Sequence, residues 1–134
     1  MANEPFADSI EQHTLKNEDF RRVLYTAEHS QVVLMSVPAG EEIGEEVHHV
    51  DQFMRFEEGE GTSIIDGKEF PVSPGFAVLV PAGAKHNVIN TGDEPLKLYT
   101  VYAPPNHIDG RVHHTKADAE ADTEDEEFGE QQKG

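Results

Sequence analysis

The sequence predicts a single all-β domain, either a sandwich or a barrel, and three observations predict it. Short stretches of apolar and β-branched residues alternate with turn signals at close intervals along most of the chain. Helix signals are scarce, and the sequence contains no internal repeat, so one β-domain is expected and not two fused ones. A length of 134 residues, 36% of them hydrophobic, is sufficient for one core.

Six segments are the clearest strand candidates, because each combines apolar residues with β-branched or aromatic ones. A short helical turn is expected before them, at residues 17–22, and an apolar triplet follows it at 23–25. The six candidate strands are residues 32–37, 53–56, 62–66, 77–80, 86–90 and 96–103.

Turn signals separate these strands. Asp66 and Gly67 stand between two apolar stretches, and this dipeptide favours a tight hairpin because glycine tolerates the positive φ that such a turn needs. Three further reversals are expected at Pro74-Gly75, Pro81-Ala82-Gly83 and Thr91-Gly92-Asp93.

The composition limits both the chemistry and the partners. Cysteine is absent, which excludes disulfides, thiolate zinc sites and cysteine nucleophiles, so any metal must be bound by nitrogen and oxygen. The formal net charge of -17 repels nucleic acid and anionic membranes. No apolar run approaches the roughly 18 residues that span a bilayer, and the first residues do not resemble a secretory signal. We therefore expect a cytoplasmic protein that binds a small molecule.

The C-terminal segment differs in composition from the rest of the chain. Residues 117–134 contain eight acidic residues and one lysine, with few β-branched or aromatic residues. Such a segment buries too little apolar surface to offset the entropy of ordering, so we expect a solvated tail, either disordered or helical near its start. His113 and His114, with His107 nearby, suggest a second metal site, but a solvated loop leading into the tail is the favoured interpretation.

Side chains that bind metals occur inside two of the strand-like segments. Because side chains alternate between the two faces of a strand, Glu46, His48 and Gln52 share one face if the strand is unbroken. Apolar residues continue this face, as the inside of a barrel with a metal ion near one end requires. His86 begins the strand that returns after Gly83, close to a barrel mouth.

Two alternatives to this ligand set follow from the same residues. A β-bulge would turn Glu45 and His49 inward in place of their neighbours. In the second alternative, Gln52 does not bind the ion itself but orients one of the ligands by hydrogen bonding.

The first of the two segments resembles the first signature motif of the cupin superfamily. That motif runs glycine, five residues, histidine, one residue, histidine, three or four residues, glutamate, six residues, glycine. Its spacing is kept by Gly40, Glu46, His48, Gln52 and Gly59. Two positions depart from the usual residue types, since Glu46 replaces the first histidine and Gln52 replaces the glutamate.

The second segment resembles the second cupin motif, which runs glycine, five residues, proline, one residue, glycine, two residues, histidine, three residues, asparagine. That motif is matched completely by Gly75, Pro81, Gly83, His86 and Asn90. Among these residues we expect only His86 to bind metal, while the glycines, Pro81 and Asn90 are expected to be structural.

The resemblance covers roughly residues 30–105 and implies a double-stranded β-helix, the jelly-roll barrel of single-domain cupins. It divides the chain into an N-terminal segment (1–29), the barrel (30–105) and an extension with the acidic tail (106–134). Because cupins commonly pair through outer sheet faces and N-terminal strands, it also implies a homodimer in which the 1–29 segment supplies an exchanged strand.

The resemblance also implies one divalent metal ion per chain, bound by Glu46, His48, Gln52 and His86. Two imidazoles, one carboxylate and one amide oxygen carry the same formal charge as the three imidazoles and one carboxylate that are usual. These ligand types admit zinc, manganese, iron, nickel or copper. The set is similar to the ligands of cupin phosphomannose isomerases.

The expected function is that of an enzyme whose metal ion acts as a Lewis acid on a small polar metabolite, sugar-like or keto. Isomerase-type chemistry is favoured by analogy of fold and ligand set. Glu46 is the candidate catalytic residue, a ligand first and a general base if it detaches during turnover. A second interpretation treats Glu46, His48 and His86 as the triad of a ferrous dioxygenase. A third is a non-catalytic cupin that binds a small ligand.

Overall fold

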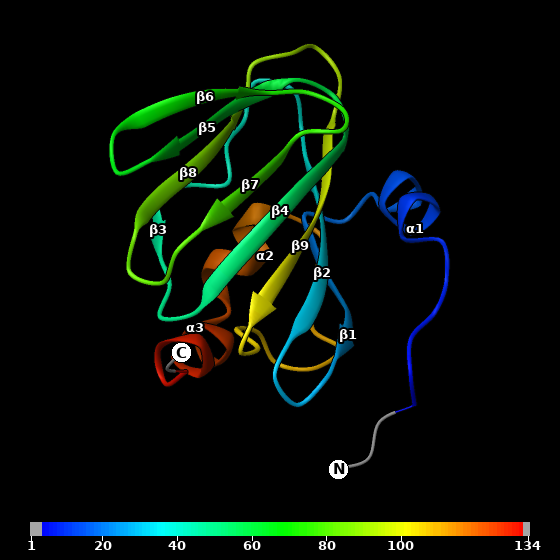
Figure 1. Cartoon of the computed structure of the whole chain (residues 1–134), viewed down its shortest axis with the longest axis vertical. Helices are drawn as coiled ribbons and strands as arrows, with labels where there is room; N and C mark the ends of the chain where they lie inside the picture. Colours follow the sequence, from blue (N-terminus) through cyan, green and yellow to red (C-terminus); the bar gives the residue numbers. More distant parts are fainter. Residues whose placement is uncertain (1–3, 133–134) are drawn as a thin grey trace.

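The chain folds into antiparallel β-sheets that face each other, with short helices on the outside (Figure 1). The computed structural model describes residues 4–132. Its elements in chain order are α1 (Ile10–Lys16), β1 (Arg21–Thr26), β2 (Gln31–Val37), β3 (Glu46–Val47), β4 (Asp51–Glu58), β5 (Gly61–Ile65), β6 (Lys68–Val72), β7 (Ala77–Val80), β8 (Lys85–Asn90), β9 (Leu96–Ala103), β10 (Val112–His113), α2 (Lys116–Ala121) and α3 (Thr123–Glu130).

Within the described residues, one sheet has six strands in the order β10-β1-β2-β9-β4-β7, and the other has four in the order β3-β8-β5-β6. Most consecutive strands lie in different sheets or are separated by other strands, as in a jelly roll. The predicted fold class, an all-β double-stranded β-helix with a short C-terminal segment, is confirmed.

Apolar side chains from both sheets fill the space between them. Met54 and Phe56 on β4 and Leu98 on β9 are almost completely buried, and Val88 on β8 meets them from the other sheet. Along β4, buried residues alternate with more exposed ones, the pattern of a strand that packs one face on a core. Burial of one large apolar side chain stabilises a fold by roughly 1.5–3 kcal/mol, so this layer holds the sheets together.

All six predicted strands are present, and their bounds differ from the prediction by at most two residues at either end. The predicted hairpin is also confirmed, because Asp66 and Gly67 join β5 to β6 and both have a positive φ, 49° and 83°. A φ in this range is unusual for aspartate and ordinary for glycine, which is why the dipeptide marks the turn.

The helical turn predicted at residues 17–22 is wrong, because the helix lies earlier in the chain. Ser9 begins α1 by accepting a hydrogen bond from the Gln12 N–H on its Oγ. The helix ends before Asn17, and β1 begins at Arg21, where the backbone pairs with β2 and β10. Pairing in a sheet therefore determines the conformation of residues that sequence alone assigned to a turn.

The acidic C-terminal segment is helical and ordered. Thr115 caps α2 through a hydrogen bond from the Asp118 N–H, and Asp122 caps α3 in the same way through the Asp125 N–H. Figure 1 shows both helices at the end of the barrel near β3. The helical alternative for the tail is confirmed and the disordered one is wrong, because α2 and α3 form and Asp125 is buried with hydrogen bonds from His107 and Ile108. Residues 133–134 of the predicted tail lie outside the described residues.

The N-terminal segment contributes β1 to the larger sheet of its own chain. β1 pairs with β2 on one side and with β10 on the other, while residues 1–3 lie outside the described part. Exchange of this segment between subunits stays a prediction, as do the boundaries of the barrel at 30 and 105. Among residues 4–132, no helix has the length and apolar character that crossing a bilayer requires.

Candidate metal centre

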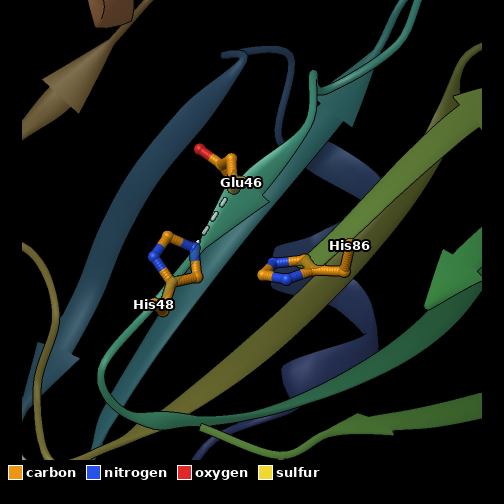
Figure 2. Close-up of side chains that lie close together, drawn as sticks. All are labelled: Glu46, His48 and His86. Atoms are coloured by element: carbon orange, nitrogen blue, oxygen red, sulfur yellow. Dashed lines mark ion pairs between the residues drawn. The ribbon is translucent and has the colours of Figure 1, made fainter. Parts of the chain in front are cut away.

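Two histidines and a glutamate meet beside the β3–β8 pair (Figure 2). Glu46 on β3 is the direct cross-strand partner of His86 on β8, so their side chains share a face of the sheet. His48 follows two residues after Glu46 and points to the same place. The ligand atoms of the three residues all lie within 4.8 Å of one another. The structure thus brings together three of the four predicted ligands.

The segment that carries Glu46 and His48 crosses from one sheet to the other. β3 and β4 belong to different sheets, so the unbroken strand assumed from the sequence is interrupted between them. The alternation of side chains continues through this crossing: Val50 is fully buried, while Glu45 and His49 are exposed. Glu45 and His49 are therefore not among the ligands that meet at the candidate centre, although both lie at the edge of the adjoining cavity.

The turn between β7 and β8 is attached to this crossing. Gly83 has a φ of 89°, and its N–H donates to the carbonyl oxygen of His48 at 2.8 Å. The Ala82 N–H donates to Asp51 Oδ1 at 2.9 Å. These bonds place the start of β8 beside the crossing, and the ring centroids of His48 and His86 lie 5.0 Å apart. The predicted reversal is confirmed, and it positions one ligand relative to another.

His86 presents an unprotonated ring nitrogen to the centre. Its Nδ1–H donates to the carbonyl oxygen of Ala84 at 3.0 Å, which leaves a lone pair on Nε2. Burial lowers the pKa of His86, so its ring is neutral near pH 7. Nε2 is buried and has no hydrogen-bond partner among the described residues. A histidine that ligates a metal has this arrangement of its two nitrogens.

Glu46 and His48 form a close pair beside His86. Glu46 Oε1 lies 3.3 Å from His48 Nε2, and the side-chain amide of Asn106 lies beside the other ring nitrogen, with Nδ2 3.3 Å from His48 Nδ1. Burial acts to raise the pKa of Glu46, but His48 and the charge of Arg21 outweigh it and bring this pKa to about 2. Glu46 is therefore ionised near pH 7, which is the state in which a carboxylate binds metal.

Gln52 lies on β4, in the other sheet, and is buried. Its Nε2 donates to Thr100 Oγ1 at 3.0 Å and to the Tyr102 hydroxyl at 3.3 Å. These two bonds fix the orientation of the amide and leave Oε1 buried, without a hydrogen-bond partner in residues 4–132. The oxygen is the atom with which an amide binds metal, and its role as fourth ligand stays a prediction.

The donor set fits a divalent metal ion. Within the described range, three atoms of the predicted ligands are buried without a hydrogen-bond partner: His86 Nε2, Gln52 Oε1 and His48 Nε2, the last of which has the ion-pair contact with Glu46 Oε1 at 3.3 Å. Buried polar atoms of native proteins are nearly always paired, so these three atoms are available to bind a ligand. Two imidazoles, a carboxylate and an amide oxygen are suitable ligands for the borderline divalent ions that the sequence admits.

A cavity of about 450 Å³ opens beside the candidate centre. Glu46 and His48 form part of its wall, which also includes Arg21, Asn106 and His107 and residues of α2 and α3. Nothing in the sequence placed Arg21, Asn106 or His107 at this site. Arg21 precedes the first motif, whereas Asn106 and His107 follow the second, and no spacing pattern connects these three residues to the ligands.

A buried histidine–aspartate pair joins the cavity wall to α3. The His107 Nδ1–H donates to Asp125 Oδ2 at 2.7 Å, and Asp125 Oδ1 accepts from the Ile108 N–H at 2.7 Å. The solvated loop predicted around His113 and His114, with His107 nearby, is therefore wrong for His107, because these contacts bury the histidine, while His114 is exposed. Burial lowers the pKa of His107 to about 4, so its ring is neutral near pH 7.

His113 is buried in a similar way. Its Nε2 lies 2.8 Å from Asp122 Oδ2, which also accepts from Arg111 Nη1 at 2.7 Å. The ligand atoms of His113, Asp122 and Asp125 lie within 4.8 Å of one another. Each of these carboxylates already accepts hydrogen bonds from protein groups, so the cluster attaches β10 to the C-terminal helices and needs no metal ion.

The burial of His107 predicts a loss of stability in acid. In metal-free protein its pKa of about 4 lies below the ordinary 6.5, so the unfolded chain takes up a proton first as the pH falls between these values. We expect His107 to remove up to about 3 kcal/mol of unfolding free energy over this interval. Urea titrations at several pH values measure the unfolding free energy. As the pH falls, this free energy should decrease more steeply for the wild type than for His107→Gln.

The control for this measurement is His114→Gln, because His114 is exposed. This variant should follow the wild-type decline. If His107→Gln also followed it, the titration of His107 would not be the cause of the acid sensitivity.

The chain is similar to known proteins in sequence and in fold. The family model of the Cupin domain matches residues 33–102, about half of the chain. YrkC of Bacillus subtilis (strain 168), described only as an uncharacterized protein, is 52% identical over 124 residues, which cover 87% of this chain and 67% of YrkC.

Solved structures give the same result. The crystal structure of BH2720 from Bacillus halodurans is 50% identical, covers 88% of this chain and 95% of its own, and has a TM-score of 0.87. The structure of KdgF from Halomonas sp. is 19% identical, with coverage of 63% and 79% and a TM-score of 0.59. This second likeness is one of fold alone.

Proposed function

This chain belongs to the cupin family, and we propose that it is an enzyme that uses one divalent metal ion as a Lewis acid on a small polar metabolite. The convergence of Glu46, His48 and His86, with Glu46 and His48 in the wall of a cavity, carries the proposal. A cavity of about 450 Å³ suits a compound of metabolite size, and we favour a sugar-like or keto substrate. Isomerase-type chemistry is favoured by analogy with the fold and the ligand set.

The ion would be held by Glu46, His48 and His86, with the amide oxygen of Gln52 as the fourth ligand. When bound, a divalent ion polarises a carbonyl or hydroxyl oxygen of the substrate and makes a proton on the neighbouring carbon more acidic. The protein fixes the ligands beforehand, since the Ala84 carbonyl sets the tautomer of His86. This preorganisation supports a catalytic centre.

Two groups of the chain are placed to accept a substrate proton. Glu46 is the predicted catalytic residue, and its carboxylate would act as a base if it were released from the ion. His107 lines the same cavity, and Asp125 holds its Nδ1–H, so that Nε2 is the basic nitrogen. Nε2 of His107 is buried and unpaired in the described part of the chain. His107 is therefore the second candidate for the general base.

The same three ligands support a second candidate function. Two histidines and one carboxylate are the ligands of non-haem ferrous oxygenases. With iron in the centre, an oxygen-dependent dioxygenase reaction would fit Glu46, His48 and His86 equally well. A cupin that binds a small ligand without turnover is the third possibility, and the identity of the metal is the first observation that separates them.

Elemental analysis and two assays test the proposal. We expect the purified full-length protein to contain about one divalent ion per chain. The protein is incubated in D₂O with a panel of aldoses, ketoses and keto acids. An isomerase should incorporate solvent deuterium at the carbon next to the carbonyl, and proton NMR detects the loss of that proton signal. Oxygen uptake by iron-loaded protein would instead identify a dioxygenase. Metal binding with neither activity would support a binding protein, and failure to bind any divalent ion would reject the metal centre.

A homodimer and a cytoplasmic location remain part of the proposal. The strong negative charge of the chain supports small molecules as partners rather than nucleic acid. Size-exclusion chromatography with light scattering measures the oligomeric state directly.

A further inference from the structure

Arg21 is a buried cation in the cavity wall. It faces inward at the start of β1, with 5% of its surface exposed, whereas the side chain of its neighbour Arg22 is 47% exposed. The backbone of Arg21 is fixed on both sides, because it pairs with Met35 on β2 and with His113 on β10. Burial of a cation is costly unless anionic or polar partners surround it.

The contacts that the protein makes with this guanidinium are loose. Nη2 of Arg21 lies 3.6 Å from Glu46 Oε2, longer than the roughly 2.7–2.9 Å of a charge-assisted hydrogen bond. Nε is buried and has no hydrogen-bond partner within residues 4–132. The guanidinium carbon lies 5.3 Å from the centre of the Phe20 ring, which fixes its position without using its N–H groups. Arg21 therefore retains donors for a ligand.

The inner end of the cavity, the cavity floor, consists here of the metal centre with Arg21, His107 and Asp125, and its charges are balanced by one anionic group. With a divalent ion bound, the ion would bring two positive charges and Arg21 a third, while Glu46 and the buried Asp125 bring one negative charge each. His107 is neutral near pH 7. The floor therefore carries a net charge of one positive unit, which a single carboxylate neutralises.

The outer part of the cavity has the opposite charge. Among the residues that line it, Glu45, Glu120, Glu126 and Glu130 are exposed carboxylates, and Lys116 is a half-buried cation. An acidic rim repels a ligand with several negative charges more strongly than one with a single negative charge. The rim therefore disfavours sugar phosphates and other dianions.

We propose that Arg21 and the metal centre together form a site for a small monocarboxylate, either a hydroxy acid or a keto acid. The carboxylate pairs with the Nε and Nη2 groups of Arg21, in the two-pronged geometry that a guanidinium offers. The hydroxyl or keto oxygen faces the ion. This inference rests on the proposed function, because the metal centre is one half of the site.

Three probes test the inference by calorimetry on the full chain loaded with Zn²⁺: glycolate, glycolamide and inorganic phosphate. Glycolamide has nearly the shape of glycolate and no charge. We expect glycolate to bind at least tenfold more tightly than glycolamide, and more tightly than phosphate. Equal affinity for glycolate and glycolamide, or stronger binding of phosphate, would overturn the inference.

Variants of the two neighbouring arginines complete the test. Arg21→Gln should weaken glycolate binding by about ten- to a hundredfold and change glycolamide binding little. Arg21→Lys keeps the charge without the planar fork and should fall between the wild type and Arg21→Gln. The matched control is Arg22→Gln, on the outer face of the same strand, which should bind as the wild type does. Unchanged glycolate affinity in Arg21→Gln would overturn the inference.

Metal content, measured in the same samples, separates the two proposals. If the wild type takes up no zinc, the proposed metal centre fails. In that case a preference of the metal-free chain for glycolate over glycolamide, lost in Arg21→Gln, would still support the carboxylate site, and no preference would reject it. If Arg21→Gln fails to fold, the wild type and Arg21→Lys decide the question.

Discussion

Replacement of His48 or His86 by alanine is expected to leave the purified protein nearly free of metal. Each change removes one of three ligands whose donor atoms lie within 4.8 Å of one another. Partners that only support a ligand account for about 10–100-fold in metal affinity, so loss of a ligand itself should cost at least about a hundredfold. Elemental analysis and a zinc titration of each variant measure the effect.

The control for both variants is His49→Ala. His49 is adjacent to His48 but exposed on the opposite side of the chain, so its loss should leave the metal content unchanged. Gln52→Leu should retain the ion with affinity lowered by about tenfold, because an amide oxygen is a weak ligand. Wild-type metal content in both His48→Ala and His86→Ala would show that the ion, if any, binds elsewhere.

Asp125→Ala should destabilise the protein by about 3 kcal/mol and loosen the C-terminal helices. The change leaves two donors unpaired, the buried His107 Nδ1–H and the half-buried Ile108 N–H. An unpaired buried donor costs roughly 1–3 kcal/mol, and two of them give the expected total. Urea unfolding measures the free energy, and amide hydrogen exchange should show faster exchange in residues 106–130 than in the barrel strands.

Glu124→Ala is the matched control on the same helix. Glu124 is 77% exposed and pairs with Arg111 at the surface, and such pairs contribute about 0–1 kcal/mol. Asp125→Asn should give an intermediate result, since its oxygen can still accept from the Ile108 N–H. If Glu124→Ala and Asp125→Ala had equal effects, the buried pair would not be what anchors α3.

The barrel could be predicted from the sequence because its signals are local. Strands β7 and β9 begin and end where the apolar residues do, and Asp66 with Gly67 marks a turn that few other residues tolerate. Glu46 and His48 could be found for a similar reason, since alternation along an extended chain places them on one face. That alternation continues through the change of sheet at residues 48–50, so the prediction holds although the strand is interrupted.

The remainder of the site depends on contacts between distant parts of the chain. Arg21 and His107 reach the cavity only because β1 and the segment after β9 fold against it, and nothing near them in sequence indicates this. The ordered structure of the acidic tail was not predicted, because the composition of a segment indicates only how much apolar surface it can bury. The structure anchors the tail with polar groups instead, through the buried Asp125 and through the cap at Thr115.

Because the chain passes from one sheet to the other at His48, the predicted ligands are divided between the two sheets. Glu46 and His86 belong to the smaller sheet and Gln52 to the larger one, so an ion shared by these residues would cross-link the two halves of the barrel. In a chain without cysteine, it would do what a disulfide does in secreted domains of similar size. Its contribution would grow with metal concentration, as for any ligand that binds only the native state, and chelators would open the barrel at this end first.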